Sequence, residues 1–332
     1  MFQNYLSNRK QSVFCNNNYS NFNSIPKGVP QGSVLGPILF LVYINDIINS
    51  STRLKFLIYA DDTTLLLKDK NIVSLHANLN LELDQIKTWV QSNKLILNIT
   101  KTNYILFQNR SIKKSIPPIM LNGEILKKVN QTQFLGVIID ENLNWKSHID
   151  HISLKISKVT GILYRVRHNL TSDALLSIYY TLCYPHFTYC VAIWASTWPS
   201  FLNKLTVAQN KIIRCICFLK KFESTTKFFS ELRILRFLFI HQYFTLLLIY
   251  RNITNNKIFK LVEHVTHTRS NNTNLICPQF RTSLFKNIVI NFAPKLFNSL
   301  PNNKKGFLKN SSIYVYKKEI KEHLLSKQLV SG

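Results

Sequence analysis

The spacing of apolar residues predicts short strands and helices in the first part of the chain. Residues 1–27 are polar and rich in asparagine, which favours turns or short strands at most. A strongly apolar run follows from Val34 to Ile48 and predicts a helix. The segments Arg53 to Tyr59 and Thr63 to Lys68 predict two strands, joined by a turn at Ala60-Asp61-Asp62.

Further helix and hairpin signals follow. Between Ser74 and Asn93, apolar residues recur at three- and four-residue steps, which predicts an amphipathic helix. Asn122-Gly123 stands between apolar flanks and predicts a hairpin with a type I′ turn. Tyr104 to Phe107 and Phe134 to Ile139 are additional strand candidates. This mixture of strands and helices predicts an α+β fold.

The second part of the chain has a helical pattern. Apolar residues from Ile149 to Val166 mark one face of a long helix, and helical patterns continue to Tyr250. The segment Asn252 to Asn274 is polar and predicts a linker or loop. The tail from Pro278 to Leu329 mixes basic residues with a predicted turn at Pro301-Asn302-Asn303.

The charge is strongly positive and unevenly distributed. The chain has 42 Lys and Arg against 16 Asp and Glu, a net charge of +26. Residues 1–150 hold 16 basic and 10 acidic residues (+6), whereas residues 151–332 hold 26 and 6 (+20). This balance suits a polyanion better than a small-molecule substrate, and such binding weakens as salt rises. An acidic membrane surface is the competing interpretation, but no basic amphipathic helix stands apart from the rest.

Neither secretion nor membrane insertion is indicated. The first nine residues lack the apolar core of a signal peptide. The six cysteines are scattered without a disulfide framework, which predicts an intracellular location, in the nucleus or the cytoplasm. The uncharged stretch from Ala174 to Asn203 contains several polar residues, so we expect a buried, aromatic-rich core segment and no membrane span.

Tyr59-Ala60-Asp61-Asp62 is the segment with the clearest chemical meaning. A tight turn between two strands presents its carboxylates at the end of a hairpin. Nucleotide polymerisation uses two divalent ions, about 3.5–4 Å apart, which bridge the attacking hydroxyl and the leaving pyrophosphate. Mg²⁺ prefers such oxygen ligands. An ordinary solvated turn is the alternative for this tetrapeptide alone, because aspartate is common at loop tips.

A second block favours the catalytic interpretation. Gly28-Val29-Pro30-Gln31-Gly32-Ser33 opens the apolar run, and Tyr43-Ile44-Asn45-Asp46 lies near its end. In this order, with the aspartate turn downstream, both blocks resemble the reverse transcriptases of jockey-like non-LTR retrotransposons. The resemblance implies that the Gln-Gly block lines the nucleotide pocket and positions the template.

The resemblance continues downstream. Leu97 to Thr102 resembles the family's Asn-x-x-Lys element, in which the lysine faces the triphosphate; an exposed lysine at a strand edge is the alternative. Phe134 to Val137 resembles the primer-grip hairpin, and the segment from Trp145 onward resembles a helical thumb with a basic side for phosphate contacts. The implied site residues are Asp61 and Asp62 for catalysis and metal binding, Gln31, Gly32, Tyr59 and Lys101 for the pocket, Leu135 and Gly136 for the primer grip, and Lys155, Lys158, Arg165 and Arg167 for the nucleic-acid backbone.

The resemblance also implies an architecture and partners. We expect a right-hand polymerase palm, truncated and without fingers, over residues 1–144. A mainly helical thumb would follow over 145–251, and a basic C-terminal region over 252–332. The implied partners are an RNA template, a DNA primer and deoxynucleotides, with two Mg²⁺ ions, no small-molecule cofactor and no membrane.

One element of the family's pattern is missing. The family has an earlier strand with a metal-binding Asp, yet no acidic residue precedes Asp46, which we expect to end its helix. Fingers and an amino-terminal nuclease domain are missing too, so we expect a truncated copy that does not extend a primer alone. Two functions remain open: an RNA-directed DNA polymerase within a longer or complemented enzyme, and a non-catalytic nucleic-acid-binding remnant of a mobile element.

Two other groups of residues receive structural interpretations. Cys183, His186 and Cys190 could share a helical face, but Pro185 interrupts it and no fourth ligand is evident, so we do not expect zinc. The aromatic residues of the uncharged stretch could stack on bases, but core packing is the favoured use. These aromatic residues are Tyr179, Tyr180, Tyr184, Tyr189, Trp194 and Trp198.

Overall fold

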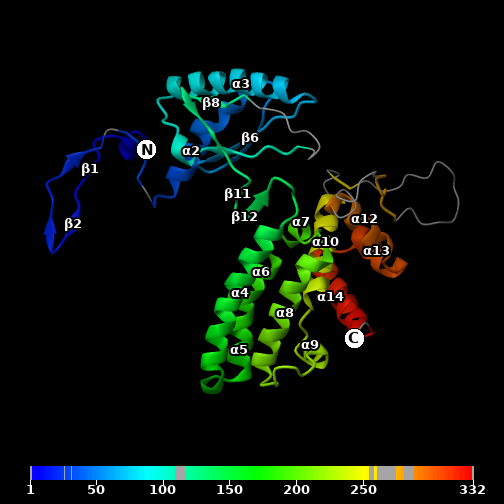
Figure 1. Cartoon of the computed structure of the whole chain (residues 1–332). Helices are drawn as coiled ribbons and strands as arrows, with labels where there is room; N and C mark the ends of the chain where they lie inside the picture. The colour runs from blue at the N-terminus through cyan, green and yellow to red at the C-terminus, as the bar shows by residue number, and fades with distance from the viewer. Residues whose placement is uncertain are drawn as a thin grey trace. The chain divides into compact units, whose positions relative to one another are not determined.

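The computed structural model describes residues 2–25, 27–30, 32–108, 117–253, 258–259, 274–279 and 288–330. Contacts within the chain divide it into two compact units, Met1–Val129 and Asn130–Gly332 (Figure 1). The first unit mixes short strands with helices, and the second is almost wholly helical. Mixed helix and strand content is therefore confirmed. The palm and thumb, and the division at residues 144 and 251, stay predictions. Most of the predicted linker over 252–274 lies outside the described residues.

The first unit begins with exposed, short elements. Its first helix and four short strands are α1 (Phe2–Leu6), β1 (Lys10–Gln11), β2 (Phe14–Cys15), β3 (Asn18–Tyr19) and β4 (Asn23–Ser24). β1 pairs with β4 and β2 with β3, both antiparallel, so the segment folds back on itself. Asn16 and Asn17 adopt positive φ angles of 50° and 60°, as a two-residue turn between twisted strands requires. Short strands were predicted here, whereas α1 was not.

The apolar run forms α2 (Leu35–Ile44), which continues as a 3-10 helix, η1 (Asn45–Ser50). The Ser33 hydroxyl accepts a hydrogen bond from the Gly36 amide at 3.1 Å, near the helix start. Asp46 lies in the first turn of η1 and accepts a hydrogen bond from the Trp89 indole at 3.4 Å. Much of the apolar surface of α2 is exposed, notably at Val34, Ile38, Leu41 and Val42.

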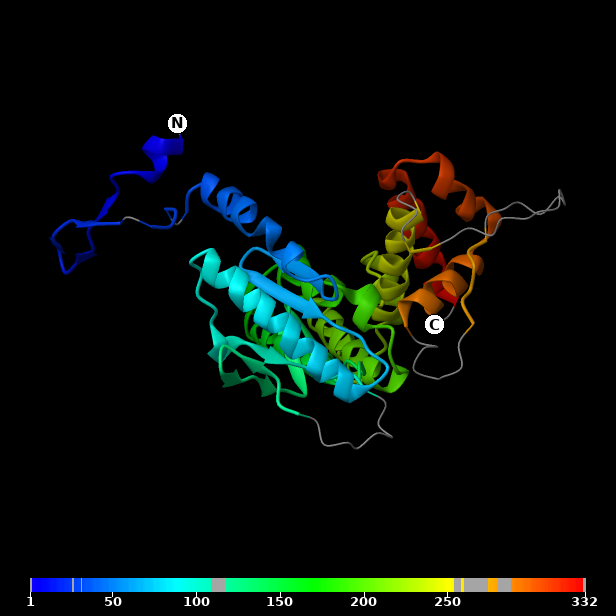
Figure 2. The same ribbon diagram turned by 90° about the horizontal axis from the view of Figure 1, so that it is seen from above.

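The core of the first unit lies between a hairpin and a long helix. Strands β5 (Lys55–Tyr59) and β6 (Asp62–Leu66) pair antiparallel, and α3 (Ile72–Ser92) runs along them (Figure 2). The Asn71 side chain caps α3 by accepting a hydrogen bond from the Val73 amide at 2.9 Å. The buried residues of this cluster are Leu54, Leu83, Ile86, Val90, Ile119, Leu121 and Leu126. Both strands and the amphipathic helix were correctly predicted.

Short elements complete the first unit. They are the 3-10 helix η2 (Ile99–Lys101) and the strands β7 (Asn103–Tyr104), β8 (Met120–Leu121), β9 (Glu124–Ile125) and β10 (Lys127–Lys128). Asn122 and Gly123 connect β8 to β9 with φ angles of 54° and 84°. Two positive φ angles define a type I′ turn, so this predicted hairpin is confirmed. β7 is shorter than the strand expected over Tyr104–Phe107 and pairs in parallel with β10.

The second unit starts with a hairpin of β11 (Gln131–Phe134) and β12 (Val137–Asp140). The single strand predicted over Phe134–Ile139 is therefore wrong, because the chain reverses at Leu135-Gly136. After β12, the Asp140 carboxylate accepts hydrogen bonds from the backbone amides of Asn142, Asn144 and Trp145 at 3.0, 3.2 and 2.9 Å. One carboxylate thus organises the loop that leads into the first long helix.

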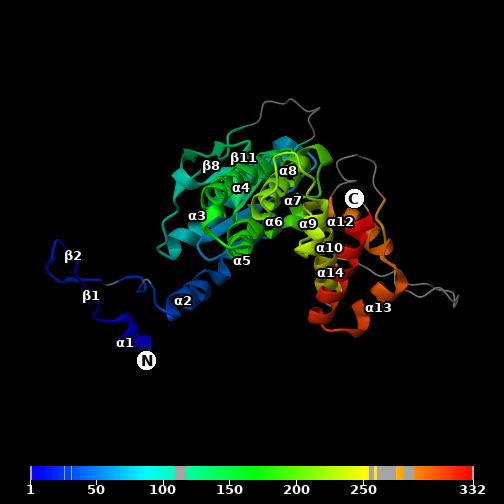
Figure 3. The ribbon, with the colours of Figure 1, turned by 90° about the horizontal axis from the view of Figure 1, so that it is seen from below.

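The remaining elements described in the second unit are helices. They are α4 (Lys146–Val166), η3 (Arg167–Asn169), α5 (Ser172–Ile178), the π-helical turn η4 (Tyr179–Cys183), α6 (Tyr184–Thr188), α7 (Val191–Trp194), α8 (Pro199–Ile216), α9 (Thr226–Glu231), α10 (Phe237–Ile253), α12 (Val289–Asn298), α13 (Asn302–Asn310) and α14 (Ile313–Val330). α4 packs along α8 (Figure 1), and α12 and α14 both contact α10 (Figure 3). The turn expected at residues 301–303 is instead the start of α13.

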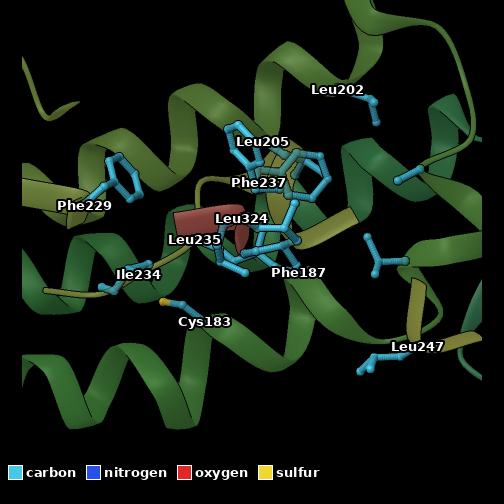
Figure 4. Close-up of a cluster of buried hydrophobic side chains, with 14 of the residues drawn as sticks. Cys183, Phe187, Leu202, Leu205, Phe229, Ile234, Leu235, Phe237, Leu247 and Leu324 are labelled. Atoms are coloured by element: carbon cyan, nitrogen blue, oxygen red, sulfur yellow. The ribbon is translucent and has the colours of Figure 1, made fainter. Parts of the chain in front are cut away.

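A large core of aliphatic and aromatic side chains holds these helices together (Figure 4). The Trp194 ring stacks on Phe237, with ring centroids 5.9 Å apart and an interplanar angle of 17°. Buried Gln209 donates hydrogen bonds to the Tyr179 hydroxyl at 3.0 Å and to the Leu235 carbonyl at 2.9 Å, so its amide nitrogen is satisfied. Core packing is thus confirmed for Tyr179 and Trp194, whereas Tyr180, Tyr189 and Trp198 are exposed.

No helix in the described part of the chain is both long and apolar enough to cross a membrane.

Candidate functional site

The two candidate catalytic carboxylates lie at the tip of the β5–β6 hairpin. Tyr59 pairs with Asp62, so only Ala60 and Asp61 form the turn, and Asp62 already belongs to β6. Ala60 adopts a positive φ of 52°, which a two-residue hairpin turn requires at this position. Asp61 and Asp62 are exposed, and the Tyr59 side chain beside them is 65% exposed. The hairpin therefore presents two adjacent carboxylates to solvent.

These carboxylates suit a hard divalent cation but make up only part of a two-metal site. Among the described residues, no group of three or more His, Cys, Asp or Glu side chains is placed to hold a metal ion. Two nearby aspartates in the sequence have other contacts. Asp46 accepts a hydrogen bond from Trp89, and Asp69 accepts hydrogen bonds from the Asn71 amide and the Asn78 side chain. The hydrogen bond from the Asn71 amide is the main cause that lowers the pKa of Asp69.

The Gln-Gly block is described only in part. Gln31 lies outside the described residues. Gly32 has a positive φ of 81°, and an added Cβ there would have no atom within 4 Å. The glycine therefore serves the backbone conformation and not a close contact within the chain. Next to it, the Ser33 hydroxyl is hydrogen-bonded to the Tyr5 hydroxyl at 2.5 Å.

Lys101 ends the 3-10 helix η2, directly before β7. The side chain of Asn98 accepts a hydrogen bond from the Lys101 amide at 3.2 Å. The asparagine of the Asn-x-x-Lys element therefore caps the turn that carries the lysine. The Lys101 side chain is exposed, and within the described part of the chain no hydrogen bond or ion pair joins it to Asp61 or Asp62.

The candidate primer grip is the turn of the β11–β12 hairpin in the second unit. Leu135 and Gly136 have positive φ angles of 45° and 83°. The Tyr189 hydroxyl donates a hydrogen bond to the Leu135 carbonyl at 2.5 Å. A Cβ added at Gly136 would lie 3.5 Å from the Tyr189 ring. Tyr189 therefore braces this turn from a helical connection more than fifty residues later, a role that the sequence did not indicate.

A pocket of about 330 Å³ opens beside this turn. Its polar lining comes from helices α4 and α6 and from the residue that follows α6, namely His148, His151, Lys155, His186 and Tyr189. Burial, followed by the charges of the nearby His151 and Lys155, lowers the pKa of His148 to about 4. Burial, followed by Lys155 and His151, also lowers the pKa of His186. The histidines were missed as a group because α4 and α6 are distant in sequence.

The predicted basic side of α4 is present in part. Lys155, Lys158 and Arg165 are exposed on the helix. Arg167 lies beyond the helix end, in η3, and its guanidinium is 5.2 Å from the ring centroid of Tyr164 and 5.7 Å from that of Phe218. Three cations thus line the exposed helix, whereas the fourth packs against aromatic rings.

The chain resembles known polymerases in sequence. Residues 1–139 match the family model described as reverse transcriptase (RNA-dependent DNA polymerase). The RNA-directed DNA polymerase from mobile element jockey of Drosophila melanogaster is 29% identical over 64% of this chain and 24% of that protein. The protein of the same name from Drosophila funebris is 29% identical over 65% of this chain. The probable RNA-directed DNA polymerase from transposon BS of Drosophila melanogaster is 27% identical over 65%. No solved structure matches the chain.

Residues 1–139 are therefore a reverse transcriptase domain. More specifically, the chain is homologous to the RNA-directed DNA polymerases of non-LTR retrotransposons, which confirms the resemblance seen in the sequence motifs. It spans about a quarter of the length of the curated relatives it matches.

Proposed function

We propose that this chain supplies part of the palm, the thumb and the basic C-terminal region of an RNA-directed DNA polymerase. The observation that carries the proposal is the pair of exposed carboxylates at the tip of the β5–β6 hairpin, inside the segment that matches reverse transcriptases. The substrates would be an RNA template, a DNA primer and deoxynucleotides. The palm would extend to residue 144, the thumb from 145 to 251 and the C-terminal region from 252 to 332.

Each candidate residue has a role in this proposal. Asp61 and Asp62 would hold divalent metal, with Mg²⁺ the expected ion because it prefers carboxylate oxygen. Bound metal would stabilise charge on the reacting phosphates. The remaining assignments are Gln31, Gly32, Tyr59 and Lys101 for the nucleotide pocket, Leu135 and Gly136 for the primer end, and Lys155, Lys158, Arg165 and Arg167 for the nucleic-acid backbone.

The chain's own carboxylates do not complete the metal site. Asp61 and Asp62 are consecutive at the tip of one hairpin, so both would reach an ion from the same element. No acidic residue precedes Asp46 in this sequence, so residues 1–45 offer no opposing carboxylate. Because loss of a bridging ligand removes alignment as well as charge stabilisation, this chain alone should not extend a primer.

A complementation experiment tests the proposal. The 332-residue chain would be assayed for primer extension with Mg²⁺, alone and fused to the segment that precedes the Gln-Gly block in the jockey relative. We expect extension only by the fusion. Asp61→Ala should then reduce the rate by several orders of magnitude, whereas Asp69→Ala, a carboxylate engaged in capping contacts, should not. Extension that survives Asp61→Ala would overturn the catalytic assignment.

A non-catalytic nucleic-acid-binding role is the second candidate. The net charge of +26 and the incomplete carboxylate set favour it for the chain by itself. The same assay separates the two functions when duplex binding is measured in parallel. Tight duplex binding by a fusion that never extends the primer would favour the binding role.

A further inference from the structure

The pocket beside the β11–β12 turn has an unusual electrostatic composition. Its titratable lining groups are His148, His151, Lys155, His186 and Tyr189, and no carboxylate is present among the described residues that line it. After burial, which is the larger cause, Lys155 and His151 are close enough to lower the pKa of both His148 and His186. An anion that binds between such closely spaced basic groups would stabilise their protonated forms.

The neighbouring acidic residue does not neutralise this cluster. Asp150 is on α4 between the two lining histidines, but its carboxylate forms an ion pair with Lys204 on α8 at 2.5 Å. That contact belongs to the packing of α4 against α8. Asp150 therefore does not neutralise the positive charge of the pocket, which remains able to attract an anionic ligand.

The buried His148 ring adds a second, independent observation. Its side chain is 3% exposed, and its Nδ1 accepts a hydrogen bond from the Ile138 amide at 3.3 Å. An accepting Nδ1 puts the proton of the neutral ring on Nε2. Nε2 is buried and has no hydrogen-bond partner in the described part of the chain. A buried donor without an acceptor is costly, and an acceptor that enters the pocket would relieve that cost.

We infer that this pocket binds one phosphate group of the nucleic-acid backbone, with His151, His186 and Lys155 as its ligands and His148 at its floor. The inference rests on the proposed function, which makes a nucleic acid the partner. It adds three histidines to the predicted binding surface and assigns them a particular phosphate, the one next to the Leu135-Gly136 turn.

The surface of α4 indicates that the phosphate belongs to a nucleic-acid backbone and is not a free anion. His148, His151 and Lys155 follow one another at three- and four-residue steps, which puts them on one side of the helix. Lys158 and Arg165 continue this side and are exposed. A backbone that enters the pocket could then follow the helix to further cations.

The inference is tested with the full chain and a duplex of RNA template and DNA primer. The pocket variant His151→Gln/Lys155→Gln/His186→Gln would be compared with the control Lys321→Gln/His323→Gln/Lys327→Gln, which also removes three basic groups, one histidine and two lysines, from α14. We expect the pocket variant to lose about tenfold or more in affinity and the salt slope to fall by about one, with a smaller change in the control. Equal losses in the two variants would overturn the inference.

Two further measurements keep the outcome interpretable. Lys155→Gln alone changes one exposed side chain, so its loss of affinity cannot be attributed to misfolding. Inorganic phosphate, titrated while histidine ring signals are followed by NMR, should shift His151 and His186 in the wild-type chain before His323. Unshifted pocket signals would contradict the inference. The proposed polymerase function would stand in that case, because its own test is Asp61-dependent extension by the fusion.

Discussion

The two units present their candidate chemistry in opposite ways. In the first, two carboxylates are exposed at the tip of a hairpin whose core is a small aliphatic cluster. In the second, basic groups line a pocket within a unit whose core is a large cluster of aliphatic and aromatic side chains. Residues 1–129 hold 15 basic and 7 acidic residues (+8), and residues 130–332 hold 27 and 9 (+18). In the proposed function the acidic site needs further ligands, whereas the basic groups of the pocket all come from the second unit.

The difference in core size gives the largest expected effect on stability. Phe237 is fully buried and stacked on Trp194, so Phe237→Ala should lower the free energy of unfolding by about 3–5 kcal/mol. Ile86→Ala in the smaller cluster removes fewer atoms and should cost about 2–3 kcal/mol. Hydrogen exchange measured on peptides of α3, α8 and α10 would show each loss. Unchanged protection of α8 and α10 in Phe237→Ala would break the comparison.

Buried histidines should make the second unit sensitive to acid. Burial lowers the pKa of His148 and of His241 to about 4, from an ordinary value of 6.5. Between these pH values the unfolded chain binds protons that the folded chain excludes. Stability should therefore be unaffected by these two groups above about pH 7, and should fall on acidification from pH 6.5 to 4 by up to roughly 3 kcal/mol per histidine.

Urea unfolding at several pH values checks this prediction. His241 stacks on Phe292 at 4.8 Å, so His241→Phe retains an aromatic ring and removes one titrating group. The variant should lose about half of the acid sensitivity. His168→Phe, at an exposed position, should not change it. The same pH dependence in wild type and His241→Phe would show that this burial does not control acid stability.

Local patterns predicted the first unit well. The periodic apolar positions of α3 and the Asn122-Gly123 turn depend on neighbours in sequence, and both were found as expected. The apolar pattern over Phe134–Ile139 predicted one strand and missed the turn at Leu135-Gly136, because a leucine at a φ of 45° is uncommon. Only the resemblance to the primer-grip hairpin indicated a hairpin at this position. Its stabilising contact, the Tyr189 hydroxyl, comes from a distant segment.

In the candidate site, too, the features set by neighbours in sequence were predicted and those set by distant segments were not. Asp61 and Asp62 were placed correctly on a hairpin because the motif and the turn are one tetrapeptide. The histidine pocket could not be predicted, since it requires knowing that α6 packs against α4. The spacing of His148, His151 and Lys155 was visible in the sequence, but only the packing of His186 beside them gives it meaning.

The salt dependence of duplex affinity should show whether the basic surface of the second unit binds the nucleic-acid backbone. If the pocket, Lys158, Arg165 and Arg167 together make about four phosphate contacts, duplex affinity should fall roughly 100-fold between 50 and 200 mM salt. Lys158→Gln should reduce the salt slope by about one, because it is exposed and removes one contact. Filter binding at four salt concentrations is the measurement. Affinity that does not respond to salt would exclude backbone contacts as its source.

The smallest expected effect concerns two glycines in equivalent turns. Gly123 in the first unit and Gly136 in the second have φ angles of 84° and 83°. Replacement by alanine puts a Cβ into a left-handed backbone at both positions, which should cost about 1 kcal/mol in each case. A Cβ at Gly123 meets no atom within 4 Å, and one at Gly136 makes an ordinary 3.5 Å contact with Tyr189. The two variants should therefore be equally destabilised in urea.

Their binding should differ although their stability does not. Gly136 lies at the mouth of the histidine pocket, so a methyl group there should weaken duplex affinity by a few-fold. Gly123 lines no described site, and its replacement should leave affinity unchanged. Comparing both variants in the same filter-binding series separates backbone strain from obstruction of the pocket. Equal affinity in the two variants would mean that the Leu135-Gly136 turn has a structural role without contact to the nucleic acid.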